Sequence, residues 1–349
     1  MTKTINSRNV HEAFILGVDA FTWDGDVQEQ DSRAGRTLEF DGPVVTTYEK
    51  PCERVLFWEG RDANPFFHFM EGLWMLQGRE DVEFLTHYNK GMEAFSDNGF
   101  TLNGAYGYRW REFYEKDQLD VVVKRLRNNP DDRRCVVAMW ECNNDLDRDT
   151  LDTPCNTHIY FKVRNNRLNM TVCCRSNDMI WGAYGANAVH FSMLQEYMAA
   201  RIGVEVGVYN QVSDSFHVYT ELFNSMKEKL PEFDYYTFKY PMVGNPYKTI
   251  SVFPMVNDPE EFDADLDAFF RGQKNGFANH FFSDVAIPMQ TAWDMHKLDK
   301  NTRGAISLLN SFCKAEDWKI ACVEWLERRL KGREEVKDTE AVIGETNVK

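Results

Sequence analysis

The spacing of hydrophobic positions changes several times along this chain, and each change predicts an element. Residues 66–76 are apolar almost without interruption, after Asn64-Pro65 and before Gly78, which predicts a buried helix with an amide cap and a proline in its first turn. Leu119, Val122, Val123 and Leu126 recur at helical spacing and predict an amphipathic helix over 118–128. Further helices are predicted over 9–17, 81–95, 187–201, 259–270 and 317–330.

Alternating and β-branched runs predict the strands. Residues 158–163 and 168–172 alternate on either side of Asn165-Asn166, which is the pattern of a β-hairpin. In the extended stretch 213–219, His217 and Tyr219 point to the same side. Other strands are predicted over 37–40, 44–47, 135–140, 206–212 and 249–254. Helices and strands are interspersed, so we expect an α/β (α+β) fold.

The length and composition allow one large core. The chain has 349 residues, 43% of them hydrophobic and 14% aromatic. We interpret 1–245 as the main domain and 246–331 as a C-terminal extension, mainly helical. The polar and charged segment 332–349 is expected to be a disordered tail.

Charge and cysteine usage narrow the function classes. Forty Lys and Arg against fifty-five Asp and Glu give a net charge of −15, which argues against a protein that binds a nucleic-acid backbone. The eight cysteines form no CxxC pair and no Cys/His spacing of the zinc-site type, so no metal is expected. Without a hydrophobic leader or a long apolar run, the sequence predicts no membrane span and a cytoplasmic location.

The segment 153–187 carries the candidate chemistry. Cys155 follows a turn-forming proline, and Arg175-Ser176 lies beyond the predicted hairpin. A thiol becomes a nucleophile when nearby cations lower its pKa, and Arg133, Arg134 and Arg175 lie on segments that can approach it. Arginine also binds phosphate in a bidentate manner, so one cluster can hold a phosphate monoester and activate the thiol.

Several of these features also have a purely structural interpretation. Arg33, in a polar loop beside Gly35, is a candidate phosphate ligand or part of a solvated turn, and Arg133-Arg134 can equally be a solvated strand end. Glu71 in the buried helix is either catalytic or a hydrogen-bonded core acid. Asn187 at a helix start is usually a cap.

Together these motifs resemble the thymidylate synthase superfamily, which includes the deoxyuridylate and deoxycytidylate hydroxymethylases. The resemblance runs from about residue 33 to residue 219 and implies a mixed sheet flanked by helices, to which this chain adds the C-terminal extension. The matching segments are Arg33-Ala34-Gly35, Glu71-Gly72-Leu73-Trp74-Met75-Leu76-Gln77-Gly78, Tyr106-Gly107-Tyr108-Arg109-Trp110-Arg111, Pro130-Asp131-Asp132-Arg133-Arg134, Pro154-Cys155, Arg175-Ser176-Asn177-Asp178, Asn187 and His217-Val218-Tyr219.

The resemblance implies a role for each of these residues. Cys155 would add to C6 of a pyrimidine nucleotide, while Glu71 and Tyr106 would handle protons. Asp178, Met92 and Trp110 would face 5,10-methylenetetrahydrofolate, the one-carbon donor, with Asp178 fixing its pterin. A homodimer is implied, because Arg133 and Arg134 would reach the phosphate from a partner subunit. The remaining nucleotide ligands would be Arg33, Arg175 and Ser176 at the phosphate, Asn187 at the base, and His217 and Tyr219 at the deoxyribose.

The resemblance also bears on substrate and product. Cytosine-specific members carry an aspartate at the position of Asn187, so its amide points to dUMP. Met92 stands where the synthases have a tryptophan that keeps water from the reacting methylene, and Phe95 lies near a second tryptophan position. Asn156 replaces a histidine, and Asn177 matches the hydroxymethylases. We therefore expect 5-hydroxymethyl-dUMP.

Three alternatives remain at this stage. The chain could be a thymidylate synthase that makes dTMP and dihydrofolate, or a dCMP hydroxymethylase. It could also be a non-catalytic nucleotide-binding homologue whose extra helices dock a partner protein, although such a protein would not need Cys155.

Overall fold

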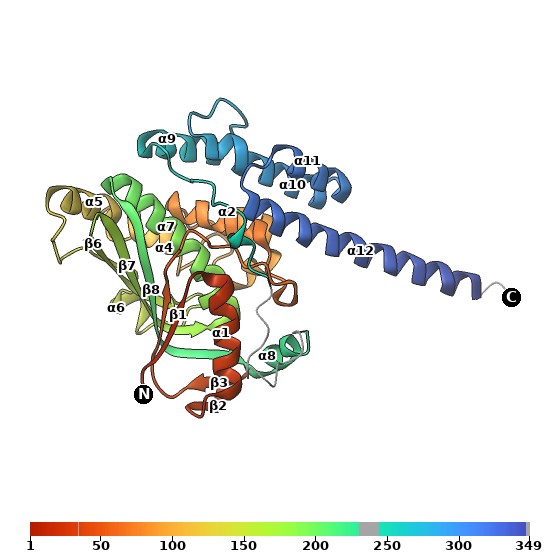
Figure 1. Ribbon diagram of the computed structural model, residues 1–349, viewed down its shortest axis with the longest axis horizontal. Helices are drawn as coiled ribbons and strands as arrows, with labels where there is room; N and C mark the ends of the chain where they lie inside the picture. Colours follow the sequence, from red (N-terminus) through yellow and green to blue (C-terminus); the bar gives the residue numbers. More distant parts are fainter. Residues whose placement is uncertain (34, 230–243, 347–349) are drawn as a thin grey trace.

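A mixed eight-stranded sheet forms the centre of the molecule (Figure 1). The computed structural model describes residues 1–33, 35–229 and 244–346, with side chains described as far as Gly332. The strand order is β1-β4-β8-β7-β6-β5, and the β2–β3 hairpin joins β8 through β3. The strands are β1 (Lys3–Ser7), β2 (Val27–Ser32), β3 (Gly35–Phe40), β4 (Val44–Tyr48), β5 (Val136–Ala138), β6 (Asn156–Arg164), β7 (Arg167–Asp178) and β8 (Glu205–Tyr219).

Helices α1 (Val10–Trp23) and α7 (Asn187–Ile202) pack on this sheet, and α2 (Pro65–Leu76) packs on α7. Around them lie shorter helical segments: η1 (Glu59–Arg61), α3 (Val82–Tyr88), η2 (Lys90–Phe95), α4 (Tyr106–Arg111), α5 (Gln118–Asn128), α6 (Cys142–Asp145), η3 (Met179–Ala186), α8 (Thr220–Lys227) and η4 (Pro246–Lys248). The last part of the chain forms α9 (Pro259–Phe270), η5 (Phe282–Ala286), α10 (Ile287–Lys297), α11 (Thr302–Phe312) and α12 (Glu316–Thr346).

The two faces of the sheet differ in burial. In β7, Leu168, Met170 and Val172 are fully buried on the side of α7, whereas the residues between them are only half-buried. The same alternation runs along most of β8, which pairs with β7 in parallel. Parallel pairs are normally covered on both faces, so the second face is the natural place for a further contact.

The helix and hairpin predictions with local capping signals are confirmed. The Asn64 side chain accepts the Phe67 backbone N–H at 3.2 Å and begins α2, as predicted. Asn165 and Asn166 both have positive φ angles and form the turn between β6 and β7. The strand predicted over 206–212 is also present, but it continues without a break to Tyr219.

Two predicted elements are wrong. The helix expected over 81–95 ends at Tyr88, because Asn89 is extended and its side chain accepts the Gly91 N–H, starting the separate η2 segment. No strand is assigned over 249–254, which runs as irregular chain in the described structure. A short β-branched run had suggested a strand, but no strand of the described residues pairs with it.

Other elements lack a clear signal in the sequence. β2 lies in the acidic run 24–31 and is almost entirely exposed, so no hydrophobic alternation marks it. Gly107, in the unpredicted helix α4, allows close helix packing, since a Cβ atom there would lie 2.0 Å from the Met75 carbonyl oxygen on α2. This packing accounts for the glycine without a ligand.

The C-terminal extension packs on α2, the helix that carries Glu71. Phe69 meets Trp318 edge to face with ring centroids 5.1 Å apart, and Phe66 lies 5.5 Å from Trp293. One hydrophobic core therefore spans both sides of the predicted boundary at residue 245. Helix α12 passes the predicted end at residue 330, reaches Thr346 and extends away from the body (Figure 1). The predicted disorder of 332–349 stays a prediction, and 347–349 lie outside the described residues.

Candidate active site

Cys155 lies immediately before β6, where the hairpin holds it beside Arg175. The Arg175 backbone N–H donates to the Cys155 carbonyl at 2.9 Å. The Arg175 side chain turns back, donates to the carbonyls of Pro154 and Thr153 at 2.9 and 3.1 Å, and places Nη2 3.9 Å from the Cys155 Sγ. The expected thiol–arginine pair is thus present in one chain.

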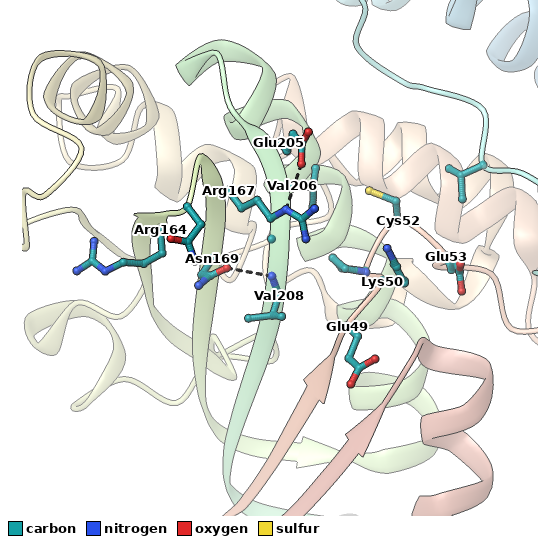
Figure 2. Close-up of a pocket in the computed structure, with 14 residues that line it drawn as sticks. Glu49, Lys50, Cys52, Glu53, Arg164, Arg167, Asn169, Glu205, Val206 and Val208 are labelled. Atoms are coloured by element: carbon teal, nitrogen blue, oxygen red, sulfur yellow. Dashed lines mark hydrogen bonds and ion pairs between the residues drawn. The ribbon is translucent and has the colours of Figure 1, made fainter.

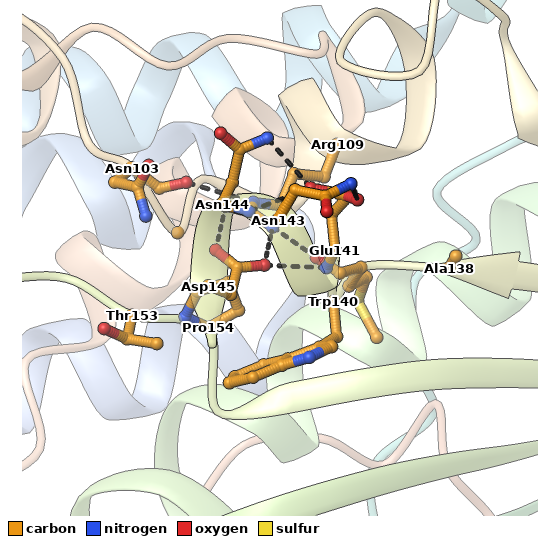
Figure 3. Close-up of polar contacts among 12 residues, drawn as sticks. Asn103, Arg109, Ala138, Trp140, Glu141, Asn143, Asn144, Asp145, Thr153 and Pro154 are labelled. Carbon is orange, nitrogen blue, oxygen red and sulfur yellow. Dashed lines mark hydrogen bonds and ion pairs between the residues drawn. The ribbon is translucent and has the colours of Figure 1, made fainter. Parts of the chain in front are cut away.

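A buried ion pair supports the loop that precedes the thiol (Figure 3). The guanidinium of Arg109 on α4 contacts both carboxylate oxygens of Asp145 at 2.6 and 2.8 Å, and both side chains are fully buried. Asp145 also accepts the Glu141 backbone N–H at 2.7 Å. This fixes the chain around Trp140, whose ring lies 5.4 Å from the Arg175 guanidinium carbon. The support would be lost with either member of the ion pair, because the other charge would remain buried alone.

Burial keeps the Cys155 thiol protonated in this state. It raises the thiol pKa above its ordinary value of 9.0; Arg175 and Arg33 act in the opposite direction, and Asp152 adds to the rise. The prediction that neighbouring cations give Cys155 a lowered pKa is therefore wrong for the free chain, because the loss of solvent outweighs their attraction. Arg33, in the turn between β2 and β3, also lowers the thiol pKa, although the sequence predicted it only as a phosphate ligand.

Tyr106 contacts the backbone on both sides of the nucleophile. Its hydroxyl oxygen accepts the N–H groups of Cys155 and Asn156, each at 3.1 Å. Burial raises the pKa of Tyr106 well above 10.0, so the phenol stays neutral and keeps its proton available. Tyr106 can therefore fix the start of β6 and donate a hydrogen bond to a ligand.

Glu71 pairs with a histidine that the sequence analysis missed. The His190 Nε2 lies 3.2 Å from both the Glu71 Oε2 and the His68 carbonyl oxygen. Burial lowers the pKa of His190 to about 3 and, with a contribution from Asp152, raises that of Glu71 to about 8. At neutral pH the site thus contains a neutral imidazole and a protonated carboxyl group. His190 follows Asn187 by three positions on α7, a helical spacing that marks it as a neighbour on the same face.

Four buried polar side chains form a hydrogen-bonded chain from the nucleophile to β8. The Asn156 Nδ2 donates to the Asn187 Oδ1 at 3.1 Å, and the Asn187 Nδ2 donates to the Asn177 Oδ1 at 3.1 Å. The Asn177 Nδ2 then donates to the Ser213 Oγ at 2.8 Å. Asn187 does begin α7, but its side chain is committed to this chain instead of capping the helix.

The ends of β7 and β8 bring another group of predicted residues together. In the parallel register Asp178 lies opposite His217, two positions beyond Ser176 and Ser215. The Asp178 Oδ1 accepts the Trp181 N–H at 2.5 Å, while Oδ2 is buried and has no hydrogen-bond partner among the described residues. Burial is the largest influence on the Asp178 pKa and raises it. The ring of His217 lies 5.8 Å from that of Tyr219, so both face the same region as predicted.

Two of the predicted phosphate ligands lie apart from this group. Arg133 and Arg134 are exposed in the loop before β5, and Arg134 makes two 2.9 Å hydrogen bonds to the Asp132 carboxylate. Neither arginine is among the charged groups that shift the Cys155 pKa. The single chain therefore leaves this arginine pair directed toward solvent.

The residues expected at the folate side differ in accessibility. Met92 is half-buried on η2, and Phe95 at the end of that segment is 49% exposed. Trp110 is fully buried and packs on Phe191 with ring centroids 5.9 Å apart. An indole without exposed surface cannot contact a ligand in this conformation, so Trp110 does not line the candidate active site.

Figure 2 shows a hollow of about 580 Å³, and Cys155 is not among the residues that line it. Its charged lining includes Lys50, Arg164, Arg167 and Glu205, and none of the predicted site residues lines it. Arg167 and Arg175 are eight residues apart on β7, which corresponds to roughly 25 Å of extended strand. The hollow therefore lies at the other end of the sheet from the thiol.

The described residues show neither a metal site nor a membrane span. They contain no group of three or more His, Cys, Asp or Glu side chains that could hold a metal ion. In the same part of the chain, no helix combines the length and the apolar character needed to cross a bilayer.

Comparisons with known proteins identify relatives of this chain. The deoxyuridylate hydroxymethyltransferase of Pseudomonas phage M6 is 45% identical over 342 residues, covering 94% of both chains. The enzyme of the same name from Bacillus phage SP01 is 41% identical over 199 residues, which is 54% of this chain and 52% of that protein. A putative thymidylate synthase of Methanothermobacter thermautotrophicus is 32% identical over 204 residues, 57% of this chain and 86% of that protein.

The phage M6 alignment and the family match cover different lengths of this chain. An alignment that covers 94% of this chain must include most of the C-terminal extension, so the phage M6 protein has a corresponding region. The model of the thymidylate synthase family matches residues 65–250, which include Glu71, Cys155 and Asn187 and amount to more than half of the chain. The chain therefore belongs to the thymidylate synthase family.

Proposed function

We propose that this chain is a deoxyuridylate hydroxymethyltransferase. It transfers the one-carbon unit of 5,10-methylenetetrahydrofolate to C5 of dUMP and completes it with the hydroxyl group of water. The observation that carries the proposal is the placement of the Cys155 Sγ 3.9 Å from the Arg175 guanidinium, with the Tyr106 hydroxyl bonded to the adjacent backbone. The name of the phage M6 relative supports the choice of substrate and product.

The order of events follows from the groups at the site. The dUMP phosphate binds Arg33, Arg175 and Ser176, and the Cys155 thiol adds to C6 through its sulfur while its proton passes to O4 of the base, which makes C5 a carbon nucleophile. C5 bonds to the donated methylene and loses its proton, and the bond to the folate nitrogen breaks. Water then adds to the methylene on C5 and loses a proton, while the thiolate leaves C6. The sum is dUMP, methylenetetrahydrofolate and water giving 5-hydroxymethyl-dUMP and tetrahydrofolate.

Glu71 is suited to moving protons in this sequence. Its pKa of about 8 means that the carboxyl group can give a proton near neutral pH and take it back within one turnover. The neutral His190, 3.2 Å away, holds the carboxyl group in place without competing for the proton. Tyr106 would assist removal of the C5 proton.

The folate substrate supplies the one-carbon unit and fits the end of β7. The Asp178 Oδ2 is a buried acceptor without a partner in the described part of the chain, and a pterin ring offers N–H donors of matching chemistry. Met92 on η2 would form the wall beside the methylene. A thioether covers less surface than an indole, so water has better access to the methylene, which favours the hydroxymethyl product.

A homodimer would complete the phosphate site. The second face of the sheet carries half-buried side chains along β7 and β8 and can be covered by the same face of another copy. Arg133 and Arg134 are exposed and remote from Cys155 in their own chain, so a partner's active site is where they can serve. His217 and Tyr219 would bind the deoxyribose hydroxyl.

Thymidylate synthase activity is the second candidate, because the family model and the Methanothermobacter relative carry that name. The test is to incubate the protein with dUMP and methylenetetrahydrofolate and to identify both products by mass spectrometry. We expect 5-hydroxymethyl-dUMP with tetrahydrofolate. Formation of dTMP with dihydrofolate would contradict the proposal and establish the second candidate.

Two controls complete this experiment. dCMP offered in place of dUMP tests a dCMP hydroxymethylase, which the proposal expects to be the weaker activity. Tritium release from C5-labelled dUMP tests for a non-catalytic homologue, because only a protein that forms the C6 adduct labilises that hydrogen. Absence of release with folate present would overturn the assignment of any C5 transfer.

A further inference from the structure

The buried chain Asn156–Asn187–Asn177–Ser213 has a direction, and that direction can be reversed. As observed, each amide donates through its nitrogen to the next residue, starting at Asn156 and ending at the Ser213 hydroxyl. An amide can turn by 180° and exchange its donor and acceptor with little change in shape, and a hydroxyl can accept or donate. All three links can therefore also be made with every donor and acceptor exchanged.

The direction of the chain decides what Asn187 offers a pyrimidine. The link to Asn156 uses one lone pair of the Asn187 Oδ1, and the link to Asn177 uses one hydrogen of its Nδ2, which leaves one acceptor and one donor site for a ligand. Uracil presents an acceptor at O4 and a donor at N3, whereas cytosine presents a donor at N4 and an acceptor at N3. The two bases therefore have donor and acceptor exchanged. An Asn187 amide that matches one base matches the other after it turns by 180°.

We infer that Asn156 and Asn177 determine base selectivity by fixing the orientation of the Asn187 amide between them. The inference rests on the proposed function and deepens it, because Asn187 alone can satisfy either base. Asn156 is fully buried, and its Oδ1 has no hydrogen-bond partner among the described residues. Asn177 and Ser213 are each only 2% exposed, so solvent does not compete for the links. Both asparagines act as positioning residues.

Two isosteric substitutions on opposite sides of Asn187 test the inference. A carboxylate can only accept. Asn177→Asp accepts from the Asn187 Nδ2 and from the Ser213 hydroxyl, which keeps the Asn187 amide as it is. In Asn156→Asp the new carboxylate repels the Asn187 Oδ1. The Asn187 amide therefore turns, so that its Nδ2 donates to the carboxylate. Both variants add one buried negative charge next to the same residue, so each is the matched control for the other.

The readout is the ratio of kcat/KM for dUMP to that for dCMP. With Asn177→Asp we expect the ratio to stay at or above the wild-type value, whatever happens to the rate. With Asn156→Asp we expect it to fall at least about 30-fold, because both hydrogen bonds of the preferred base are then mismatched. Equal shifts in both variants, or an unchanged ratio in Asn156→Asp, would overturn the inference.

Binding and a milder variant keep the test decisive. If Asn156→Asp fails to fold, Asn156→Ala removes the donor without adding charge, and the ratio should fall by a smaller factor; an unchanged ratio would again overturn the inference. Calorimetric titration with dUMP and dCMP measures the same preference without turnover. A wild-type protein that binds dUMP but turns over neither nucleotide would contradict the proposed function alone. Normal turnover with no split between the two aspartate variants would contradict the inference alone.

Discussion

The two ends of the proposed nucleotide site are built differently. At the base end, Asn156, Asn187 and Asn177 are buried and linked to one another by hydrogen bonds of 3.1 Å, all within one chain. At the phosphate end, Arg33 and Arg133 are exposed on separate loops. The first end is buried and hydrogen-bonded before any ligand arrives, whereas the second includes exposed side chains and, in the proposal, is assembled from two subunits.

This difference assigns a separate task to each end. Preorganised buried groups discriminate between similar ligands, because a mismatch leaves a buried polar group without a partner. Exposed arginines attract an anion, and their contribution is weakened by solvent and salt. We therefore expect the base end to govern selectivity and chemistry, and the phosphate end to govern affinity.

Removal of the nucleophile at the buried end should have the largest effect. Cys155→Ala is expected to lower turnover of dUMP at least about 1,000-fold while leaving dUMP affinity within about threefold, because the thiol bonds to the base only during reaction. Steady-state kinetics and calorimetry measure the two quantities. Cys142→Ala, at an exposed cysteine on α6, is the control. Appreciable turnover by Cys155→Ala would remove the nucleophile assignment.

Substitution at the exposed end should act through affinity and across subunits. The double variant Arg133→Ala, Arg134→Ala is expected to raise KM for dUMP about 10- to 100-fold, because two charge-assisted phosphate contacts are lost. When this variant is unfolded and refolded together with Cys155→Ala and assayed at dUMP well below its raised KM, the mixture should show roughly a quarter of the wild-type activity, since half of the dimers are hybrids with one intact site. A mixture no more active than its components would show that the arginines do not cross subunits.

Substitutions of Met92, on the folate side of the site, should have a smaller effect, which is on the ratio of the two products. Met92→Trp is expected to lower the ratio of hydroxymethyl to methyl product several-fold, because a larger aromatic ring limits the access of water to the methylene. Met92→Leu, with a similar volume, is the control and should leave the ratio near the wild-type value. Product ratios by mass spectrometry measure the effect. Identical ratios in both variants would exclude Met92 as the residue that sets water access.

The smallest predicted effect concerns stability. Burial raises the pKa of Glu71 from 4.5 to about 8, so the folded chain holds a proton that the unfolded chain releases in this window. The free energy of unfolding should therefore fall as pH rises from about 4.5 to 8. The Glu71→Gln side chain does not titrate, so the free energy of unfolding of this variant should rise by about 1–3 kcal/mol relative to that of wild type between these two pH values. Urea denaturation at three pH values measures it, with the exposed Glu83→Gln as control; a parallel pH dependence in wild type and Glu71→Gln would contradict the burial of a protonated Glu71.

The success of the sequence predictions depended on how local the signal was. The start of α2 and the β6–β7 hairpin are set by nearby residues, Asn64 and Asn165-Asn166, and both were predicted. The break at Asn89 and the exposed strand β2 were not, because one depends on a single side-chain bond and the other carries no buried face. Cys155 and Arg175 could be paired through the hairpin. The link between His190 and Glu71, and the buried chain through Asn156, join residues far apart in sequence and became visible only in the fold.

The central claim is that water captures the methylene on C5 of a Cys155-bound pyrimidine. The most direct test is turnover of dUMP with methylenetetrahydrofolate in water enriched in oxygen-18, followed by mass analysis of the nucleotide. We predict a 5-hydroxymethyl-dUMP that carries the heavy oxygen in its new hydroxyl group, together with tetrahydrofolate. A product without a hydroxymethyl group, accompanied by dihydrofolate, would show that hydride is transferred in place of water and would contradict the claim.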